Sequence, residues 1–447
     1  MNKFQKSLVS IALPVTLQSL LQSSFSVIDQ VMIGQLGSES IAGIGLGGKF
    51  ASVYSVVLGA VAAAAGIMIA QYIGQKNEKG ISRSFNINLL ISALIAAVFM
   101  AVCLLFTHTI MSVYTKDSST SALAEEYLRI YALSFIPMAI STMASVLLRC
   151  IEAAVFPLIA SFLSVIINTG MNYLLIFGKL GFPAMGVKGA AIASVISQFV
   201  ACFLTVCFMV SRIRQQQMKM KADLRLDKSS WIQYICILGP ILACEFMWVL
   251  GENVYAAIYG NIGTDACAAM TMTGPVQGLM IGALSGLAQA AGIMIGKALG
   301  NGEYDEAYQD SKRLMKYGLA GSLILSVALV LLGKYYVLIY NVDTTVRTVA
   351  YQLLIVFAIV SPIKVQNMIL GGGIIRSGGK TKYVMWIDII GTWVFGVPLG
   401  LFSAFVLKLP IPYVYFILSQ EELVRMIISL VIFRRKTWMD NLIYNEV

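Results

Sequence analysis

The chain has 447 residues, enough for about three soluble domains at roughly 150 residues each, but its composition contradicts a soluble protein. Hydrophobic residues make up 58% and charged residues 12%, whereas soluble domains have roughly 45–50% and 25%. These values indicate a polytopic α-helical membrane protein and exclude secreted scaffolds, nucleic-acid-binding domains and disordered chains. The formal net charge of +10 comes from basic residues in short loops, which is a topology signal rather than a binding patch.

Polar, Gly-rich and Pro-rich breaks divide the chain into twelve apolar segments, each near or above the roughly 20 residues that span a bilayer. In chain order we expect these spans at about 8–34, 44–73, 84–113, 124–148, 157–177, 187–211, 231–259, 266–296, 314–340, 345–373, 383–406 and 411–434. The longest polar connection separates two groups of six. The predicted organisation is therefore an N-terminal lobe, a cytoplasmic linker, a C-terminal lobe and a cytoplasmic tail, at 1–210, 211–230, 231–436 and 437–447.

The distribution of Lys and Arg predicts the orientation of these spans. With both termini in the cytoplasm, the inner connections hold 22 basic residues and the outer connections hold 7. Cytoplasmic loops carry the excess of basic residues in membrane proteins. We therefore expect a multi-pass protein of the cell membrane, plasma or inner, with both ends inside.

An internal repeat relates the two halves. The hexapeptide AAGIMI at 64–69 recurs at 290–295, and the same offset of 226 residues pairs Pro14 with Pro240 and Gly74 with Gly300. An even number of spans separates the copies, so both lobes have the same orientation and are related by an axis along the membrane normal. The repeated glycines form small-xxx-small ladders, which we interpret as sites of close helix packing.

Ionisable residues inside a span are costly, by roughly 2.5 kcal/mol or more, so each is a candidate functional residue. Asp29 lies about five residues before the outer end of the first span. A carboxylate in a low-dielectric cavity favours protonation, which suits it to carry a proton or to exchange it for a cation. The alternative is an Asp that only snorkels to the interface or is hydrogen-bonded locally.

Two amides on the fifth span, Asn168 and Asn172, are spaced i, i+4. We expect both to point toward a cavity near Asp29 and assign the three residues to cation coupling. Interhelical hydrogen bonding without transport is the alternative role.

A second polar group lies in the C-terminal lobe. Four of its members share one face of the seventh span, at i, i+3, i+7 and i+10, where two acids and two aromatic rings could hold an organic cation. Lys364 on the tenth span, beside Asn367, could neutralise one of these acids, with Asp388 on the eleventh span as another partner. The predicted substrate-binding cluster is therefore Glu245, Trp248, Glu252, Tyr255, Lys364, Asn367 and Asp388. An ion-pair network that only holds the lobe together is an equally weighted alternative.

Glu421 and Arg425 are spaced i, i+4 on the last span, and we expect them to satisfy each other as structural residues. The single histidine, His108, leaves no histidine-based metal site or catalytic triad, and we predict no metal site. The sequence lacks GxSxG, HExxH and GxxxxGK[ST] motifs, so we expect a protein that is not an enzyme.

Four stretches carry a family resemblance, namely LPVTLQSLLQSSFSVIDQVMIGQLGSESIAG, NYLLIFGKLGFPAMGVKGAAIAS, GPILACEFMWVLGENVYAAIYGNIGTDACAA and GGGIIRSGGKTKYVMWIDIIGTWVFGVPLG. In order and spacing they resemble the multidrug and toxin extrusion (MATE) family of secondary transporters over essentially the whole chain. The resemblance implies two six-helix bundles around a cleft that alternates between outward- and inward-open states. It also implies exchange of a proton or sodium ion for an organic, often cationic, compound, with no cofactor besides the ion gradient.

The resemblance assigns the coupling carboxylate to Asp29, fifteen residues after Pro14. Some relatives carry an Asp where this chain has Asn172. The acidic positions of the sodium-coupled NorM-like branch align with Trp248 and Val365, although Glu245 could substitute. The chain therefore resembles the DinF-like branch more closely, and we favour protons over sodium.

Two other functions are compatible with many helices. A lipid-linked oligosaccharide flippase of related fold should have extra helices or a strongly basic cavity, whereas the cavity candidates here are acidic or neutral. A membrane receptor or scaffold without transport would leave the acids in the first and seventh spans without a purpose. The partners we expect are a small organic substrate and the lipid bilayer, with no nucleic acid and no required protein partner.

Overall fold

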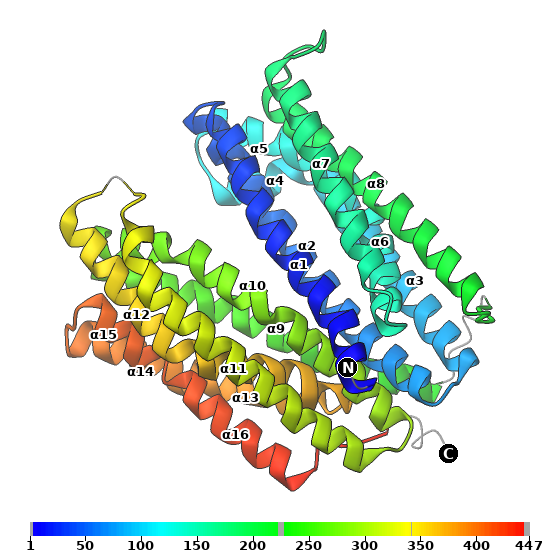
Figure 1. The fold of residues 1–447 in the computed structure, drawn as a ribbon. Helices are drawn as coiled ribbons and strands as arrows, with labels where there is room; N and C mark the ends of the chain where they lie inside the picture. The colour runs from blue at the N-terminus through cyan, green and yellow to red at the C-terminus, as the bar shows by residue number, and fades with distance from the viewer. Residues whose placement is uncertain (1–2, 222–227, 341, 442–447) are drawn as a thin grey trace. The chain divides into compact units, whose positions relative to one another are not determined.

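A computed structural model describes residues 3–221, 228–340 and 342–441, and all regular structure in these ranges is helical (Figure 1). The first half contains α1 (Lys3–Gly34), α2 (Ser38–Gly74), α3 (Glu78–Leu105), α4 (Thr107–Tyr114), α5 (Ser118–Tyr131), the 3₁₀ turn η1 (Ala132–Ser134), α6 (Phe135–Cys150), α7 (Val155–Phe177) and α8 (Gly186–Gln215). The predicted all-α class is confirmed.

The second half follows the same order but contains three π-helical stretches. It consists of α9 (Lys228–Ile262), α10 (Thr264–Gly300), α11 (Tyr304–Val337), α12 (Thr344–Asn367), η2 (Met368–Ile375), α13 (Thr381–Ile389), η3 (Ile390–Gly396), α14 (Val397–Leu401), η4 (Phe402–Val406), α15 (Ile411–Leu418) and α16 (Glu421–Arg435). Each predicted span has a helical counterpart. Five of the predicted spans correspond to more than one helical element in the structure.

Ten helical segments of the described chain are long and apolar enough to cross a membrane. The last predicted span, 411–434, is not among them because it is interrupted between α15 and α16 at Ser419 and Gln420. Consequently α16 begins at Glu421, with Glu421 and Glu422 in its first turn. Acidic side chains are favoured there because the helix dipole is positive at the N-terminus.

The repeat seen in the sequence is also present in the helix boundaries. An offset of 226 residues separates Ser38 from Thr264 and Gly74 from Gly300, the two ends of α2 and α10. α1 and α9 each contain an internal proline, Pro14 and Pro240, at the same offset. The two halves are therefore duplicated at the level of individual helices.

Contacts divide the chain into two units. The N-terminal unit comprises Leu17–Ile69 and Lys76–Arg225, and the C-terminal unit comprises Met1–Thr16, Ala70–Gln75 and Leu226–Val447. The first part of α1 and the last turn of α2 thus pack with the second half of the chain. The lobe boundaries given above from sequence stay a prediction.

Within the N-terminal unit, α8 packs along α7 and α6, and α3 packs against α6 (Figure 1). Tyr54 of α2 is fully buried, donates a hydrogen bond to the Phe135 carbonyl at 2.8 Å and stacks on the Phe135 ring. A smaller apolar cluster joins Ile44 and Tyr127 to Ala190 and Ala191 of α8. These contacts fix α6, α7 and α8, which supply most of the walls of the cavity described below.

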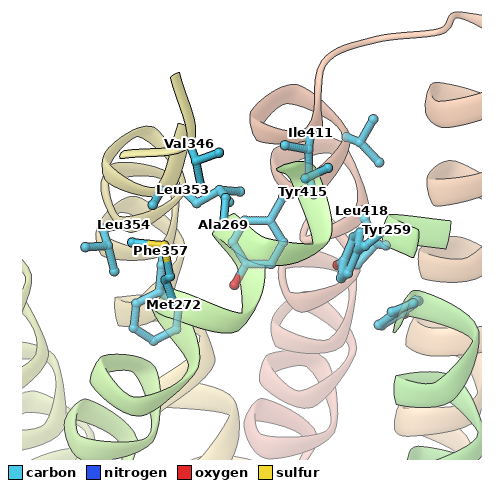
Figure 2. Close-up of a cluster of buried hydrophobic side chains, with 14 of the residues drawn as sticks. Tyr259, Ala269, Met272, Val346, Leu353, Leu354, Phe357, Ile411, Tyr415 and Leu418 are labelled. Carbon is cyan, nitrogen blue, oxygen red and sulfur yellow. The ribbon is translucent and has the colours of Figure 1, made fainter. Parts of the chain in front are cut away.

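The C-terminal unit has a larger apolar core, shown in Figure 2. Phe357 and Leu353 of α12 are buried with Met272 of α10 and Tyr415 of α15. Burying an aliphatic or aromatic side chain stabilises a water-soluble fold by about 1.5–3 kcal/mol, but in lipid the corresponding gain comes from close packing.

α11 has the pattern of a lipid-facing helix. Ile324, Val327 and Leu331 recur at i, i+3 and i+7 and are exposed, whereas the opposite face buries small residues, including Ser322 and Ser326. Large apolar side chains outside and small ones inside are typical of helices that pack within a bilayer.

Two of the repeated glycines, Gly74 and Gly300, lie where α2 and α10 cross within the C-terminal unit. A Cβ atom added at Gly74 would overlap the Lys297 carbonyl oxygen, and one added at Gly300 would overlap the Gln71 carbonyl oxygen. The two backbones can approach this closely only because neither residue has a side chain. The close packing predicted for the glycine ladders is present at this crossing.

The C-terminal segment covers the same crossing. The Asn441 amide donates to the carbonyl oxygens of Leu299 and Gly300 at 3.0 and 3.2 Å, which satisfies the last turn of α10. Trp438 is fully buried, and Asp440 forms an ion pair with Lys380 at 2.7 Å. The described part of the predicted tail is therefore packed onto the helix ends.

We expect Gly74→Ala and Gly300→Ala each to destabilise the protein by about 1–3 kcal/mol, because overpacking a tight contact forces the backbones apart. The measurement is the thermal unfolding midpoint in detergent. Gly59→Ala is the matched control in α2, since a Cβ at Gly59 meets no atom within 4 Å. Midpoints that fall equally in all three variants would contradict the close-crossing interpretation.

Candidate functional site

A polar stripe follows the part of α1 that belongs to the N-terminal unit. Gln18, Gln22 and Asp29 lie at i, i+4 and i+11, which places them on one helix face. All three line a cavity of about 520 Å³ enclosed by residues of the N-terminal unit. This volume lies within the roughly 300–1,000 Å³ that small-molecule sites occupy.

The predicted cation-coupling residues are brought together at one end of this cavity. The Asn172 amide donates to Asp29 Oδ1 at 2.9 Å. In the amide orientation that satisfies its surroundings, the Asn168 nitrogen lies 3.1 Å from Asp29 Oδ2 and 3.2 Å from Oδ1. The carboxylate of Asp29 is therefore held by two amides spaced one turn apart on α7.

The other end of the cavity contains a cation. Arg149, in the last turn of α6, donates from Nη2 to the Gln18 Oε1 atom at 3.0 Å. The Gln18 amide in turn donates to Ser161 of α7 at 2.7 Å. Arg149 is thus held in the wall by a chain of hydrogen bonds that joins α6, α1 and α7.

Hydroxyl groups dominate the walls between these ends. Helices α6, α7 and α8 each contribute a polar face. The Ser and Thr residues of the lining are Ser141, Thr142, Ser145, Ser161, Ser164, Ser194, Ser197 and Thr205. Tyr127 and Tyr131 add aromatic surface. Among the described lining residues, Asp29 is the single acid and Arg149 the single base.

A second pocket, of about 290 Å³, lies inside the C-terminal unit. Of the predicted substrate cluster, it is lined by Glu245, Trp248, Lys364, Asn367 and Asp388. Trp248 is 47% exposed, so its ring is available to a ligand. The sequence therefore predicted five of the residues that this pocket brings together.

Two members of the predicted cluster lie elsewhere. Glu252 is exposed and is not among the residues that line the pocket. Tyr255 is buried and donates a short hydrogen bond to Glu421 Oε2. The four residues expected on one face of the seventh span therefore do not form one site. Two line the pocket, one is exposed outside it, and one is buried against α16.

Arg425 is the centre of the ionic network in this pocket, and its partners extend beyond its own helix. Its guanidinium lies 3.5 Å from Glu421, 3.6 Å from Asp388 and 3.9 Å from Glu422. It also hydrogen-bonds the Thr392 hydroxyl. The predicted i, i+4 pair of Glu421 and Arg425 is present, but Arg425 also reaches Asp388 on α13.

Lys364 forms its ion pair with an acid of the last span, although Glu252 of the seventh span, one of the partners expected from sequence, also acts on its charge. Lys364 Nζ lies 3.9 Å from Glu422 Oε1, and Asn367 donates to Glu422 Oε2 at 2.8 Å. Glu245 is instead paired with Arg376 at 3.8 Å. Glu422 of the last span thus neutralises Lys364 of the tenth span.

Two local features explain these differences. The π-helical stretch η2 separates Lys364 from Arg376, and a π-helix has more residues per turn than the 3.6 assumed in assigning helix faces. The break before α16 places Glu421 and Glu422 at a helix start. Neither feature has a strong sequence signal, because Gly371–Gly373 continue the apolar run of the tenth span without a polar break.

The N-terminal cavity contains several residues that sequence reasoning missed, chiefly Gln18, Gln22 and Arg149. The sequence nevertheless carried a signal for a polar cavity wall on α7. Ser161, Ser164, Asn168 and Asn172 recur at i, i+3, i+7 and i+11 on α7, which is a polar stripe along an otherwise apolar helix.

A family model described as MatE matches residues 14–174 and 240–402 of the chain. The chain belongs to the MATE family. The resemblance found in the sequence is confirmed at this level, and the assignment to the DinF-like branch stays a prediction. As members of the family are transporters, this protein is a transporter and not an enzyme.

Curated relatives cover most of the chain. "Probable multidrug resistance protein NorM" of Bacillus thuringiensis subsp. konkukian is 26% identical over 89% of this chain and 89% of its own length. A protein of the same name from Thermotoga maritima is 24% identical, and "Uncharacterized transporter YisQ" of Bacillus subtilis is 22% identical over 97% of this chain and 95% of its own.

Solved MATE structures share the fold. A mutant of the Vibrio cholerae MATE transporter VcmN has a TM-score of 0.88 at 17% identity and covers 99% of this chain and 98% of its own. A MOP superfamily transporter from Pyrococcus furiosus has a TM-score of 0.87 at 16% identity, covering 97% and 96%. The predicted MATE-like fold of twelve transmembrane helices in two six-helix bundles is confirmed.

We expect Arg425→Met to destabilise this MATE protein by about 3–5 kcal/mol, since it leaves Asp388, Glu421 and Glu422 clustered in a buried site without their central cation. Thermal unfolding in detergent measures the effect. Arg434→Met removes an exposed arginine from the end of the same helix and is the control. An Arg425→Met midpoint no lower than that of the control would rule out the central role of Arg425.

Proposed function

We propose that this MATE transporter is a secondary active antiporter, which exports organic compounds, drugs among them, in exchange for protons by alternating access. Sodium is the alternative coupling ion. The proposal of drug export is supported by the names of the relatives, several of which are described as multidrug resistance proteins.

The single observation that carries ion coupling is the position of Asp29. It is the one acidic residue among the described lining of the N-terminal cavity, and its partners are neutral amides rather than basic groups. An acid without a cationic partner changes its charge when it takes up a proton. The charge of the cavity therefore depends directly on whether Asp29 is protonated.

The amides suit both states of the carboxyl group. Asn172 donates its nitrogen to Asp29, while its buried Oδ1 atom has no hydrogen-bond partner in the described chain. An amide carries both a donor and an acceptor, so rotation of the Asn172 amide would let Oδ1 accept from a protonated Asp29. A second Asp at this position would instead add a like charge next to Asp29.

The C-terminal pocket favours protons over sodium as the coupling ion. The position that would carry a glutamate in the sodium-coupled branch is Trp248, and Glu245 has Arg376 as a neighbour at 3.8 Å. A guanidinium beside the carboxylate opposes binding of a further cation. Glu245 is therefore a poor substitute ligand for sodium.

The membrane potential can drive such an exchange. Moving one elementary charge inward releases about 2.3 kcal/mol per 100 mV. The excess of basic residues in the proposed inner connections favours both termini in the cytoplasm of a plasma or inner membrane. With this orientation Asp29 lies toward the outer side, from which protons enter.

We expect Asp29→Asn to abolish substrate efflux driven by an imposed pH gradient in inverted vesicles, because the amide cannot exchange a proton. Efflux of a fluorescent drug is followed with proton and sodium gradients imposed separately. Wild-type protein should respond to the proton gradient.

Glu126→Gln is the matched control, since Glu126 is an acid of the same unit that forms a surface ion pair with Lys188 at 2.7 Å. Its proton-driven efflux should stay near the wild-type rate. Proton-driven efflux in Asp29→Asn equal to that of the control would refute the coupling role, and a response of the wild type to sodium alone would identify sodium as the ion.

A further inference from the structure

We propose that the N-terminal cavity binds cargo that carries an acidic group, a carboxylate or a phosphate, and that Arg149 binds this group at the end opposite Asp29. This inference rests on the proposed transport function and names its substrate class. Arg149 becomes a specificity-determining residue of the transporter.

Arg149 is placed as a ligand-binding group would be. Its guanidinium lines the cavity and is oriented by Gln18, which is itself fixed by Ser161. A guanidinium has five N–H donors in a rigid fork, so it can bind Gln18 and an anionic group at the same time. Carboxylates and phosphates match this fork through paired hydrogen bonds.

The two charges of the cavity lie far apart. Gln18, which contacts Arg149, and Asp29 are eleven residues apart on α1, about 16 Å at 1.5 Å per residue. A cargo molecule can therefore place an acidic group at Arg149 without approaching the Asp29 carboxylate. The hydroxyl-bearing residues between the two ends would hydrogen-bond its polar middle.

The chemistry of the walls argues against a simple lipophilic cation. Eight Ser and Thr residues and four uncharged amide side chains, Gln18, Gln22, Asn168 and Gln198, line the cavity, against five apolar side chains, Ala62, Met138, Val146, Val165 and Ala201. Four of the hydroxyls, those of Ser141, Ser164, Ser197 and Thr205, donate to carbonyl oxygens of the backbone. An apolar surface placed against the wall would still remove water from the remaining hydrogen-bonding capacity of its hydroxyls and amides, which costs free energy. A cargo rich in hydrogen-bonding groups avoids that cost.

The charged groups of the cavity also argue against a cargo that carries only positive charge. Asp29 accepts hydrogen bonds from two amides, and Arg149 repels a cation that enters its end of the cavity. A molecule with only positive charge therefore has no favourable site near Arg149. A molecule with an acidic group, whether zwitterionic or anionic overall, has one.

The test uses a matched pair of fluorescent xanthylium dyes, one with a free benzoate and the other with the same benzoate as its methyl ester. Fluorescence polarisation measures the binding of each dye to purified full-length protein in detergent. We expect the wild type to bind the acid more tightly than the ester. Arg149→Gln should lower the ratio of acid to ester affinity about tenfold or more, because a charged hydrogen bond is lost.

Two further variants separate recognition from folding. Arg149→Lys keeps the charge without the fork and should retain part of the preference for the acid. Arg129→Gln removes an exposed arginine of the same unit that does not line the cavity, and its ratio should equal that of the wild type. Thermal unfolding of each variant shows whether it is folded.

Wild-type protein that binds the ester as tightly as the acid, or that does not bind the acid, would overturn the proposal. So would an equal loss of both dyes in a folded Arg149→Gln protein. Failure of the antiport proposal gives a different result, since the acid preference in detergent would persist while the imposed gradients had no effect on transport.

Discussion

A bilayer offers polar groups no hydrogen-bond partners, and this constraint organises the interior of the protein. The carboxylate of Asp29 must be satisfied by other helices, and two amides of α7 provide its partners. Arg149 is held by Gln18, and Arg425 is held by three acids. In each case the polar residue fixes the relative positions of the helices that contribute its partners. The same groups that line the two pockets thus also specify the packing.

The duplicated halves have diverged in charge while keeping their helix boundaries. Each half contains a polar pocket, but the N-terminal cavity has one acid and one base, and the C-terminal pocket has an interconnected ionic network. In the network every charge lies within 4 Å of an opposite charge. The partners of Asp29 are neutral amides instead. The two halves therefore differ in how their acidic side chains are held, by amides in the N-terminal cavity and by cations in the C-terminal pocket.

The cross-packing of α2 and α10 links the repeat to the stability of the C-terminal unit. Gly74 and Gly300 bring two helix backbones into contact, and Asn441 satisfies the carbonyl groups at the end of α10. Close backbone approach gives van der Waals contact that lipid cannot replace. The shared pair Gly74 and Gly300 lies where the packing leaves no room for a side chain.

The sequence by itself determined the membrane class, the spans, the repeat and the family, because apolar length and glycine spacing are local properties that any helix in lipid must satisfy. It also identified Asp29, Asn168 and Asn172, since polar residues at helical spacing in an apolar segment are conspicuous. Only the tertiary structure decided which charges pair. The ion pairs of Lys364 with Glu422 and of Arg425 with Asp388 join different helices, and their register depends on π-helical turns and on the break before α16. Contacts of this kind depend on how helices are rotated against one another, which no single segment encodes.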